Sequence, residues 1–169
     1  MKYKGTLTYS EYLIDLADEL SITRSLLSSN IYNENTEKFR GEDENRISKQ
    51  GVLGELIARE HFKLITKPTT NYKFARIIDS NPLPEPDLKI RNFTFDIKCI
   101  ANTDLFMVNE KAFLNKDKKV DFYWFIRLLG NCECQHWIVR YDEVAEWELK
   151  QFKYTKAYWS RIQKHLELI

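Results

Sequence analysis

The sequence predicts an α/β or α+β fold in which helices flank a central mixed β-sheet of about five strands. Helical and strand-like patterns follow one another along the chain in the order α, β, β, β, α, β, β, α. The run "VDFYWFIRLL", residues 120–129, is almost continuously apolar, which is typical of a strand buried on both faces. The chain has 169 residues, of which 43% are hydrophobic, so we expect a single domain over residues 1–169.

The first part of the chain is predicted to be helical. From Ser10 to about Leu27 the apolar residues follow helical spacing, with Thr8 or Ser10 as candidate N-caps. Residues 28–49 are polar and carry both charge signs, which suits a loop, an exposed helix or both. The stretch "QGVLGELIAREHFKLI", residues 50–65, returns to an apolar helical pattern. We therefore divide the chain into an N-terminal helical extension, residues 1–48, and a core that begins at residue 49.

Short strands are predicted next. The first three are "YKFARII" (72–78), "DLKI" (87–90) and "FTFDIKCI" (93–100), with a tight turn at residues 91–92. Residues 109–118 have the pattern of a short helix, and the apolar strand at 120–129 should be central in the sheet. After the turn "GNCECQ" come a last strand, "HWIVRY" (136–141), and a helix from about Asp142, "DEVAEWELK". The core then ends at residue 148, and we expect a basic and aromatic helix over residues 149–169.

Charge and composition exclude several classes of protein. The 26 lysine and arginine residues nearly balance the 25 acidic residues, so any nucleic-acid site must be a local patch. No segment reaches the roughly 20 apolar residues of a membrane span, and the first residues lack the pattern of a signal peptide. We therefore expect a cytoplasmic protein with no membrane contact. The three cysteines fit reduced cytosolic thiols, because the "CEC" spacing is not that of a zinc site.

Two carboxylates and a lysine are predicted to meet in the hairpin at residues 87–98. Side chains alternate along a strand, so Phe95 and Ile97 face the core while Asp96 and Lys98 share the opposite face. If the two strands pair through the turn at 91–92, Asp87 lies near Asp96. Converging carboxylates repel each other unless a cation neutralises them, and such oxygen ligands suit Mg²⁺ or Mn²⁺. The pattern predicts a divalent metal site at which Lys98 orients a water or neutralises developing charge.

A third acid, Glu55, is expected on the helix over residues 50–65. It shares a helix row with Gly51, Ala58 and Phe62, so its side chain should face the protein and reach the metal site. Glycine costs a helix roughly 1 kcal/mol relative to alanine. Gly51 and Gly54 would be explained if this helix must lie close to the sheet.

These residues resemble the PD-(D/E)XK nuclease superfamily. The resemblance rests on Glu55 in "GELIAR", Asp87 in "EPD" and Asp96-Ile97-Lys98 in "DIK", and it spans about residues 51–98. It implies a restriction-endonuclease-like core and a Mg²⁺-dependent DNA endonuclease, with Mn²⁺ as a substitute ion. It also implies Asp87, Asp96 and the backbone carbonyl of Ile97 as metal ligands, Glu55 as a supporting acid at the metal, and Lys98 as the catalytic lysine. The gap from Asp87 to Asp96 is short, which the tight hairpin accommodates.

Basic residues mark the surfaces that are predicted to bind nucleic acid. The C-terminal segment interleaves basic and aromatic residues and has no acid from residue 149 to residue 166, although such aromatic residues more often complete a core. A second basic patch follows the predicted catalytic strands, and one lysine lies near the predicted metal site. The predicted contacts are Lys89, Lys116, Lys118, Lys119, Lys153, Lys156 and Arg161.

The leading hypothesis is a nuclease that hydrolyses phosphodiester bonds in DNA through a metal-activated water, with RNA as an open alternative substrate. The main alternative is a non-catalytic nucleic-acid-binding or assembly protein that keeps the fold and uses the acids as structural pairs. A third hypothesis is a small protein-binding partner or inhibitor that uses an aromatic surface. Cutting both strands of a duplex would favour a homodimer, with the N-terminal helix and residues 28–49 as candidate dimer surfaces.

Overall fold

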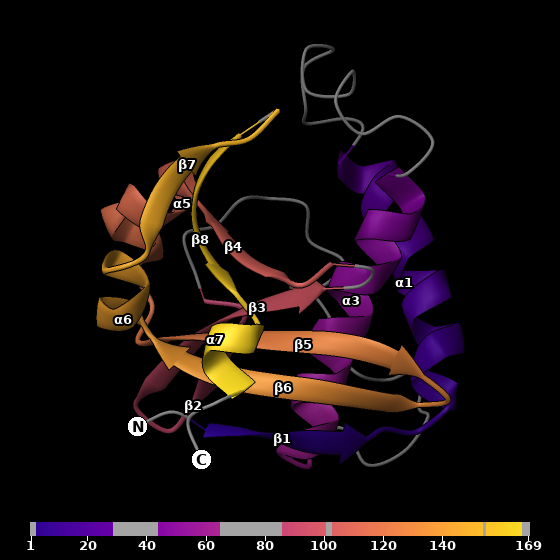
Figure 1. Cartoon of the computed structure of the whole chain (residues 1–169). Coiled ribbons are helices and arrows are strands. Elements are labelled where there is room, and N and C mark those ends of the chain that lie inside the picture. Colours follow the sequence, from indigo (N-terminus) through magenta and orange to yellow (C-terminus); the bar gives the residue numbers. More distant parts are fainter. Residues whose placement is uncertain (1–2, 29–43, 65–85, 101–102, 154, 167–169) are drawn as a thin grey trace.

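A five-stranded mixed sheet forms the centre of the protein, and a three-stranded sheet packs near it (Figure 1). The computed structural model describes residues 3–28, 44–64, 86–100, 103–153 and 155–166. The order of the central sheet is β1 (Tyr3–Thr8), β6 (Glu133–Arg140), β5 (Phe122–Gly130), β3 (Phe93–Ile100) and β2 (Leu88–Ile90). The order of the second sheet is β4 (Leu105–Asn109), β8 (Lys156–Arg161) and β7 (Glu148–Gln151). The predicted α/β class with a central mixed sheet is confirmed.

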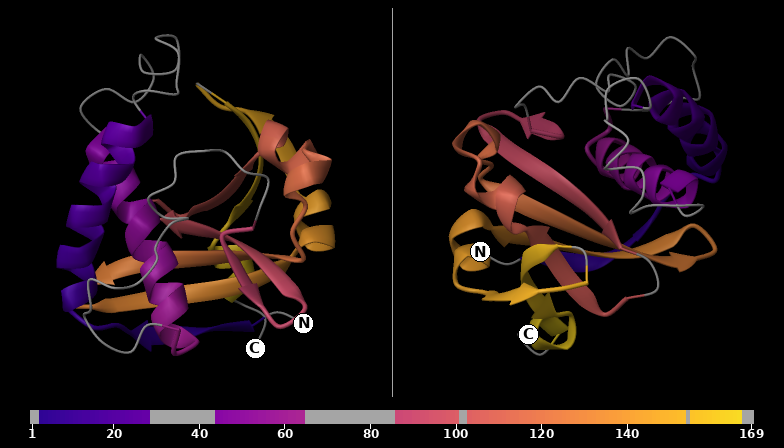
Figure 2. Two further views of the ribbon diagram at one scale, coloured as in Figure 1. Left: turned by 180° about the vertical axis from the view of Figure 1, so that it is seen from behind. Right: turned by 90° about the horizontal axis from the view of Figure 1, so that it is seen from above.

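Two long helices cover one face of the central sheet. Helix α1 (Tyr12–Ser28) packs against α3 (Glu44–His61), and α3 packs against β3. Their apolar side chains share one hydrophobic core with the side of the sheet that carries Phe95 and Ile97. The second sheet, α5 (Glu110–Leu114) and α6 (Tyr141–Ala145) form another core on the opposite face. Figure 2 shows the helix pair on one side of the central sheet and the second sheet on the other.

Strand β5 is the central strand, as its apolar sequence predicts. Tyr123 and Phe125 point into the core shared with the second sheet, whereas Trp124 and Ile126 point toward the long helices. All four residues are at most 2% exposed, which explains why the run is apolar without alternation. From Phe95 onward, β3 pairs with β5 in parallel. The polar hairpin is therefore built on the most deeply buried strand of the sheet.

Asp121 fastens the starts of these two parallel strands. Its Oδ2 atom accepts hydrogen bonds from the backbone N–H (2.8 Å) and the hydroxyl (2.7 Å) of Thr94. The backbone N–H of Asp121 donates in turn to the Thr94 carbonyl (3.1 Å). Parallel strands need a crossover, which here runs through β4, α5 and the 3-10 turn η2 (Lys116–Lys118). The bonds of Asp121 thus set the point at which β3 begins alongside β5.

The two long predicted helices and the polar hairpin are confirmed. Helices α1 and α3 match the predictions at 10–27 and 50–65, with α3 beginning earlier, at Glu44. Strands β2 and β3 match "DLKI" and "FTFDIKCI", and Arg91 in the turn has a φ of 54°, as a tight hairpin turn requires. The predicted strand at 72–78 and residues 29–43 lie outside the described residues. No helix within the described ranges is long and apolar enough to cross a membrane.

The N-terminal extension is not only helical, because residues 3–8 form β1, an edge strand of the central sheet. It pairs antiparallel with β6 along its whole length. The stretch "YKGTLT" has little apolar character, and it forms a strand because the open edge of β6 offers backbone hydrogen-bond partners. A Cβ added at Gly5 would lie 3.1 Å from His136 Nε2, so glycine allows this close pairing. Strand β4 was likewise absent from the prediction.

The prediction of a C-terminal helix is wrong. Helix α6 ends at Ala145, and the antiparallel hairpin of β7 and β8 follows it, with the short α7 (Gln163–Leu166) after the hairpin. The turn of the hairpin is closed by a hydrogen bond from the Phe152 N–H to the Thr155 carbonyl (2.8 Å). Aromatic residues and threonine favour strands, and this preference outweighs the helical spacing. The segment from residue 149 onward is therefore a basic and aromatic hairpin.

Candidate functional site

Helix α3 lies close to β3, which brings Glu55 to the polar hairpin. A Cβ added at Gly54 would lie 2.7 Å from the Cβ of Cys99, too close for two carbon atoms, so glycine is required there. The same explanation is wrong for Gly51, since nothing lies within 4 Å of an added Cβ at that position. Glu55 is 6% exposed and Ala58 is fully buried. The prediction that this helix row faces the protein is confirmed.

Arg59 connects Glu55 to Asp87, and sequence reasoning missed it. Its Nη1 lies 3.6 Å from Glu55 Oε2 and donates a hydrogen bond to the Glu55 carbonyl (3.1 Å). Its Nη2 donates to the backbone carbonyl of Asp87 (2.9 Å). The spacing of four residues from Glu55 was the available signal, because such residues share a helix face. Arg59 therefore fixes the start of β2 against α3.

Asp87 stands directly before β2, and its side chain reaches the middle of β3. Its Oδ2 accepts a hydrogen bond from the backbone N–H of Ile97 (2.8 Å). The pairing of Leu88 with Phe95 sets the register of the hairpin and places Asp87 across from Asp96. The predicted approach of the two carboxylates is confirmed. The role of the Ile97 carbonyl as a metal ligand stays a prediction.

Asp96 and Lys98 lie side by side on one face of β3, as alternation predicts. Lys98 Nζ is 2.6 Å from Asp96 Oδ1, and the two side chains are 34% and 23% exposed. Asp96 Oδ1 itself is buried, and its close contact is the ion pair with Lys98. This oxygen accepts no hydrogen bond from the described residues. It is thus a buried carboxylate oxygen whose contact with Lys98 is electrostatic.

The charges of the four predicted residues act on one another. Burial raises the pKa of Asp96 to about 6, Lys98 opposes this rise, and the charge of Asp87 adds to it. Burial lowers the pKa of Lys98, but Asp96, Asp87 and Glu55 together outweigh it, so that this pKa lies above its ordinary value. Among the three carboxylates, Asp96 acts most strongly on Lys98 and Glu55 acts least. Glu55, Asp87, Asp96 and Lys98 form one group, here called the carboxylate cluster.

Tyr123 borders the carboxylate cluster from β5. It lies across from Asp96 in the parallel register and is 2% exposed. Burial raises the pKa of its hydroxyl, and the charge of Asp96 adds to this rise. Its position was not visible in the sequence, because the pairing of β3 with β5 joins segments that only the fold brings together.

The donor atoms of the carboxylate cluster suit a hard divalent cation such as Mg²⁺ or Mn²⁺, which prefers oxygen ligands. Asp96 Oδ1 fits best, because it is buried and accepts no hydrogen bond from the described residues. Within the described ranges, no three His, Cys, Asp or Glu side chains already have the spacing of a metal site. A metal ion would therefore compete with Lys98 for Asp96 and draw the carboxylates closer together.

The predicted nucleic-acid contacts lie at three places, and all seven are exposed. Lys89 lies in the hairpin of the carboxylate cluster. Lys116, Lys118 and Lys119 lie in or directly after η2. Lys153, Lys156 and Arg161 lie on the β7–β8 hairpin. Lys119 Nζ sits 4.8 Å from the centre of the Tyr141 ring, and Lys156 pairs with Glu110 at 3.0 Å. Of these residues, Lys89 alone lies in the β2–β3 hairpin, next to the carboxylate cluster.

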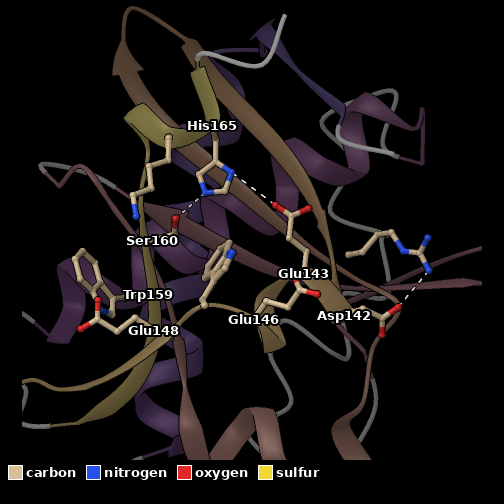
Figure 3. Close-up of a pocket in the computed structure, with 10 residues that line it drawn as sticks. Asp142, Glu143, Glu146, Glu148, Trp159, Ser160 and His165 are labelled. Atoms are coloured by element: carbon tan, nitrogen blue, oxygen red, sulfur yellow. Dashed lines mark hydrogen bonds and ion pairs between the residues drawn. The ribbon is translucent and has the colours of Figure 1, made fainter.

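A separate cavity of about 720 Å³ is lined by residues of α6, β7, β8 and α7 (Figure 3). Ser160 Oγ is 2.8 Å from His165 Nε2, and His165 Nδ1 is 3.8 Å from Glu143 Oε1. Hydroxyl, imidazole and carboxylate follow the order of a hydrolase triad, but 3.8 Å is too long for the hydrogen bond that orients the imidazole. Ser160 also lies within a regular strand and is 8% exposed. We assign these residues the structural role of fastening α7 to β8 and α6.

A comparison of the chain with protein-family models, curated proteins and solved structures gave no match. The functional argument therefore rests on the arrangement of the chain's own residues.

Proposed function

We propose that the protein is a metal-dependent nuclease that hydrolyses phosphodiester bonds, with DNA as its substrate. The observation that carries the proposal is the carboxylate cluster, in which Lys98 pairs with Asp96 at 2.6 Å and its pKa is also raised by Asp87 and Glu55. The same residues, Glu55, Asp87, Asp96 and Lys98, carry the resemblance to the PD-(D/E)XK nuclease superfamily. The proposal thus has two supports, residue type in the sequence and proximity in the fold.

Each residue of the carboxylate cluster has a chemical role in this proposal. Asp87 and Asp96 hold the metal ion through their carboxylates, assisted by Glu55 and the Ile97 carbonyl. The bound ion supplies charge stabilisation at the phosphate and a lowered pKa for its water. Lys98, whose raised pKa keeps it protonated at neutral pH, orients the attacking water or neutralises charge on the phosphate. Attack forms one P–O bond and breaks one P–O ester bond, and the leaving oxygen takes up a proton.

A non-catalytic nucleic-acid-binding or assembly protein is the alternative, and one feature favours it. Lys98 already neutralises Asp96 in the carboxylate cluster, and Arg59 lies 3.6 Å from Glu55, so the acids have structural partners without a metal ion. Under this alternative the protein binds nucleic acid in the presence of EDTA and cleaves nothing.

We also propose that a duplex-cutting form is a homodimer, because two-fold related active sites match the two-fold related strands of DNA. Light scattering of the protein with and without duplex DNA measures the mass of the complex. A dimeric mass on the duplex supports this proposal. A monomer that makes only single-strand nicks contradicts it.

The cysteines fit a cytoplasmic location, which is part of the same proposal. Cys99, Cys132 and Cys134 are free thiols. Burial raises the pKa of Cys99 to about 12 and that of Cys134 to about 11, so these two groups are poor nucleophiles at neutral pH. Thiols of this kind persist in a reducing compartment.

Cleavage of plasmid, linear and branched DNA, with an RNA for comparison, tests the proposal in Mg²⁺, Mn²⁺ or EDTA. We expect cutting that requires a metal ion and is at least about 100-fold slower in Lys98→Ala, the scale of losing one electrostatic contact to the transition state. Asp104→Asn is the matched control, because Asp104 pairs with Arg127 at 2.8 Å but is 61% exposed. This control should cut at the wild-type rate. Folded wild-type protein that cuts no substrate with either metal would contradict the proposal.

A further inference from the structure

The β7–β8 hairpin carries a basic and aromatic surface made of Lys150, Phe152, Lys153 and Trp159, here called the hairpin surface. Residues 149–161 include three lysines and one arginine and no acid. Lys150 and Lys153 are exposed, and the two aromatic residues are partly exposed. In Figure 1 the free end of this hairpin projects away from the central sheet. The charge and the aromatic rings therefore occur together at an accessible edge of the molecule.

The side chains of the hairpin surface contact one another in a specific way. Lys150 Nζ lies 5.2 Å from the centre of the Trp159 ring and 5.8 Å from that of Phe152. The two rings are 6.5 Å apart and almost perpendicular, at 85°. An ammonium group beside two aromatic rings combines the two features that bind an unpaired nucleotide, a cation for its phosphate and a ring for its base.

Trp159 belongs to the face of the second sheet that points away from the hydrophobic core. Tyr158 packs at that core, so alternation places the next residue, Trp159, on the opposite face. The indole Nε1–H of Trp159 is buried and donates to no acceptor within the described residues. Glu148, the partner of Trp159 in β7, limits the basic strip on one side.

We propose that the hairpin surface binds an unpaired segment of the nucleic-acid substrate, a step that rests on the proposed nuclease function. Charge complementarity favours nucleic acid at Lys150 and Lys153, since residues 149–161 carry only basic charges. Acids line the cavity on the other side of Trp159, with Glu148 directly across from it, so the basic strip is limited to the part of the hairpin that carries these two lysines. The aromatic rings favour a single strand, because in a duplex each base already stacks on its neighbours and offers no face to Trp159. Lysine contacts alone would not distinguish the two forms. The substrate class is therefore DNA with a single-stranded segment.

Fluorescence anisotropy with labelled oligo(dT) of about 15 nucleotides tests this inference, with a blunt duplex of the same length for comparison. Binding is measured in EDTA over a salt series, so that cleavage does not interfere. We expect oligo(dT) to bind more tightly than the duplex. Trp159→Leu should weaken oligo(dT) binding about fivefold or more, whereas Trp159→Phe retains a ring and most of the affinity.

The contribution of Lys150 to binding is measured separately, through the salt dependence of the affinity. Lys150→Gln should reduce the slope of log affinity against log salt by about 0.7, the value of one phosphate contact on a single strand. Lys111→Gln, at another exposed lysine, should leave both affinity and slope unchanged. Because Lys150 is exposed, its replacement tests binding without disturbing the fold.

The outcomes separate this inference from the nuclease proposal. Wild-type protein that cuts DNA while the Trp159 and Lys150 variants bind as it does would overturn the inference and leave the nuclease proposal intact. Binding through the hairpin surface by a protein that never cuts would support the inference and defeat the nuclease proposal. Equal affinity for oligo(dT) and duplex would also overturn the inference. So would variants that bind DNA as wild type does but no longer self-associate.

Discussion

At the scale of single residues, the ionised form of Asp96 is destabilising in the folded chain. Its pKa rises from an ordinary value of 3.8 to about 6, because it is buried beside a second carboxylate. The folded chain thus binds this proton more tightly than the unfolded chain does. The free energy of unfolding should therefore fall as pH rises from about 4 to about 7, by at most about 3 kcal/mol. Proteins retain such destabilising groups mainly where function needs them.

We expect the Asp96→Asn variant to lose this pH dependence. As the pH rises from about 4 to about 7, the free energy of unfolding of the variant should exceed that of wild type by a difference that grows by about 1–3 kcal/mol. Urea unfolding at a series of pH values measures the difference. Added Mg²⁺ should stabilise wild type more than the variant, because a ligand that binds the folded state shifts the equilibrium toward it. Two stability curves that stay parallel over this pH range would show that Asp96 is not the titrating group.

Arg59 supports the site through its contacts with Glu55 and Asp87. Its side chain is 15% exposed and that of Glu55 is 8% exposed, so Arg59→Ala removes one partner of a buried ion pair. We expect a loss of about 3 kcal/mol in the free energy of unfolding, measured with urea. Lys111→Ala, at an exposed position of α5, is the control and should change stability by less than about 0.5 kcal/mol.

A double-mutant cycle identifies the source of that loss. Combining Arg59→Ala with Glu55→Gln removes both charges, so the double variant should be more stable than the sum of the two single effects predicts. Strict additivity would mean that Arg59 stabilises the fold through its backbone contact with Asp87 and not through Glu55.

At the scale of elements, the spacing between α3 and β3 determines where Glu55 lies. Gly54→Ala should lower the free energy of unfolding by about 1–3 kcal/mol, because the new Cβ would lie 2.7 Å from the Cβ of Cys99. Gly51→Ala in the same helix should raise it by about 0.5–1 kcal/mol, since its Cβ meets nothing within 4 Å. Thermal unfolding of both variants measures these two changes in stability. Equal effects of the same sign would contradict the close packing of the helix.

Elements with a strong local pattern were predictable from the sequence, and elements that depend on a distant partner were not. The hairpin of β2 and β3 has its turn and its alternation within a few residues, and β5 is apolar throughout. By contrast, β1 depends on the free edge of β6, from the opposite end of the chain. The β7–β8 hairpin was mistaken for a helix because basic and aromatic residues at mixed spacing fit both structures.

At the scale of the whole molecule, the candidate site joins three parts of the fold. The hairpin contributes Asp87, Asp96 and Lys98, which the sequence alone placed together because they are near in the chain. Glu55 comes from the helix layer, and its approach depends on Gly54, which the sequence only suggested. The spacing of four residues from Glu55 was a local signal for Arg59, but its bond to the Asp87 carbonyl depends on the fold. Tyr123 acts through a contact between β5 and β3, so a local pattern could not reveal it.

The rate at which the protein cuts supercoiled plasmid in Mg²⁺, compared between wild type and Asp96→Asn under single-turnover conditions, tests the central claim most directly. The account predicts that wild type nicks or linearises the plasmid and that Asp96→Asn is at least about 100-fold slower. It also predicts that the variant is folded and no less stable than wild type at neutral pH. A variant that cuts at the wild-type rate would contradict the account, because the carboxylate cluster would then have no part in the chemistry.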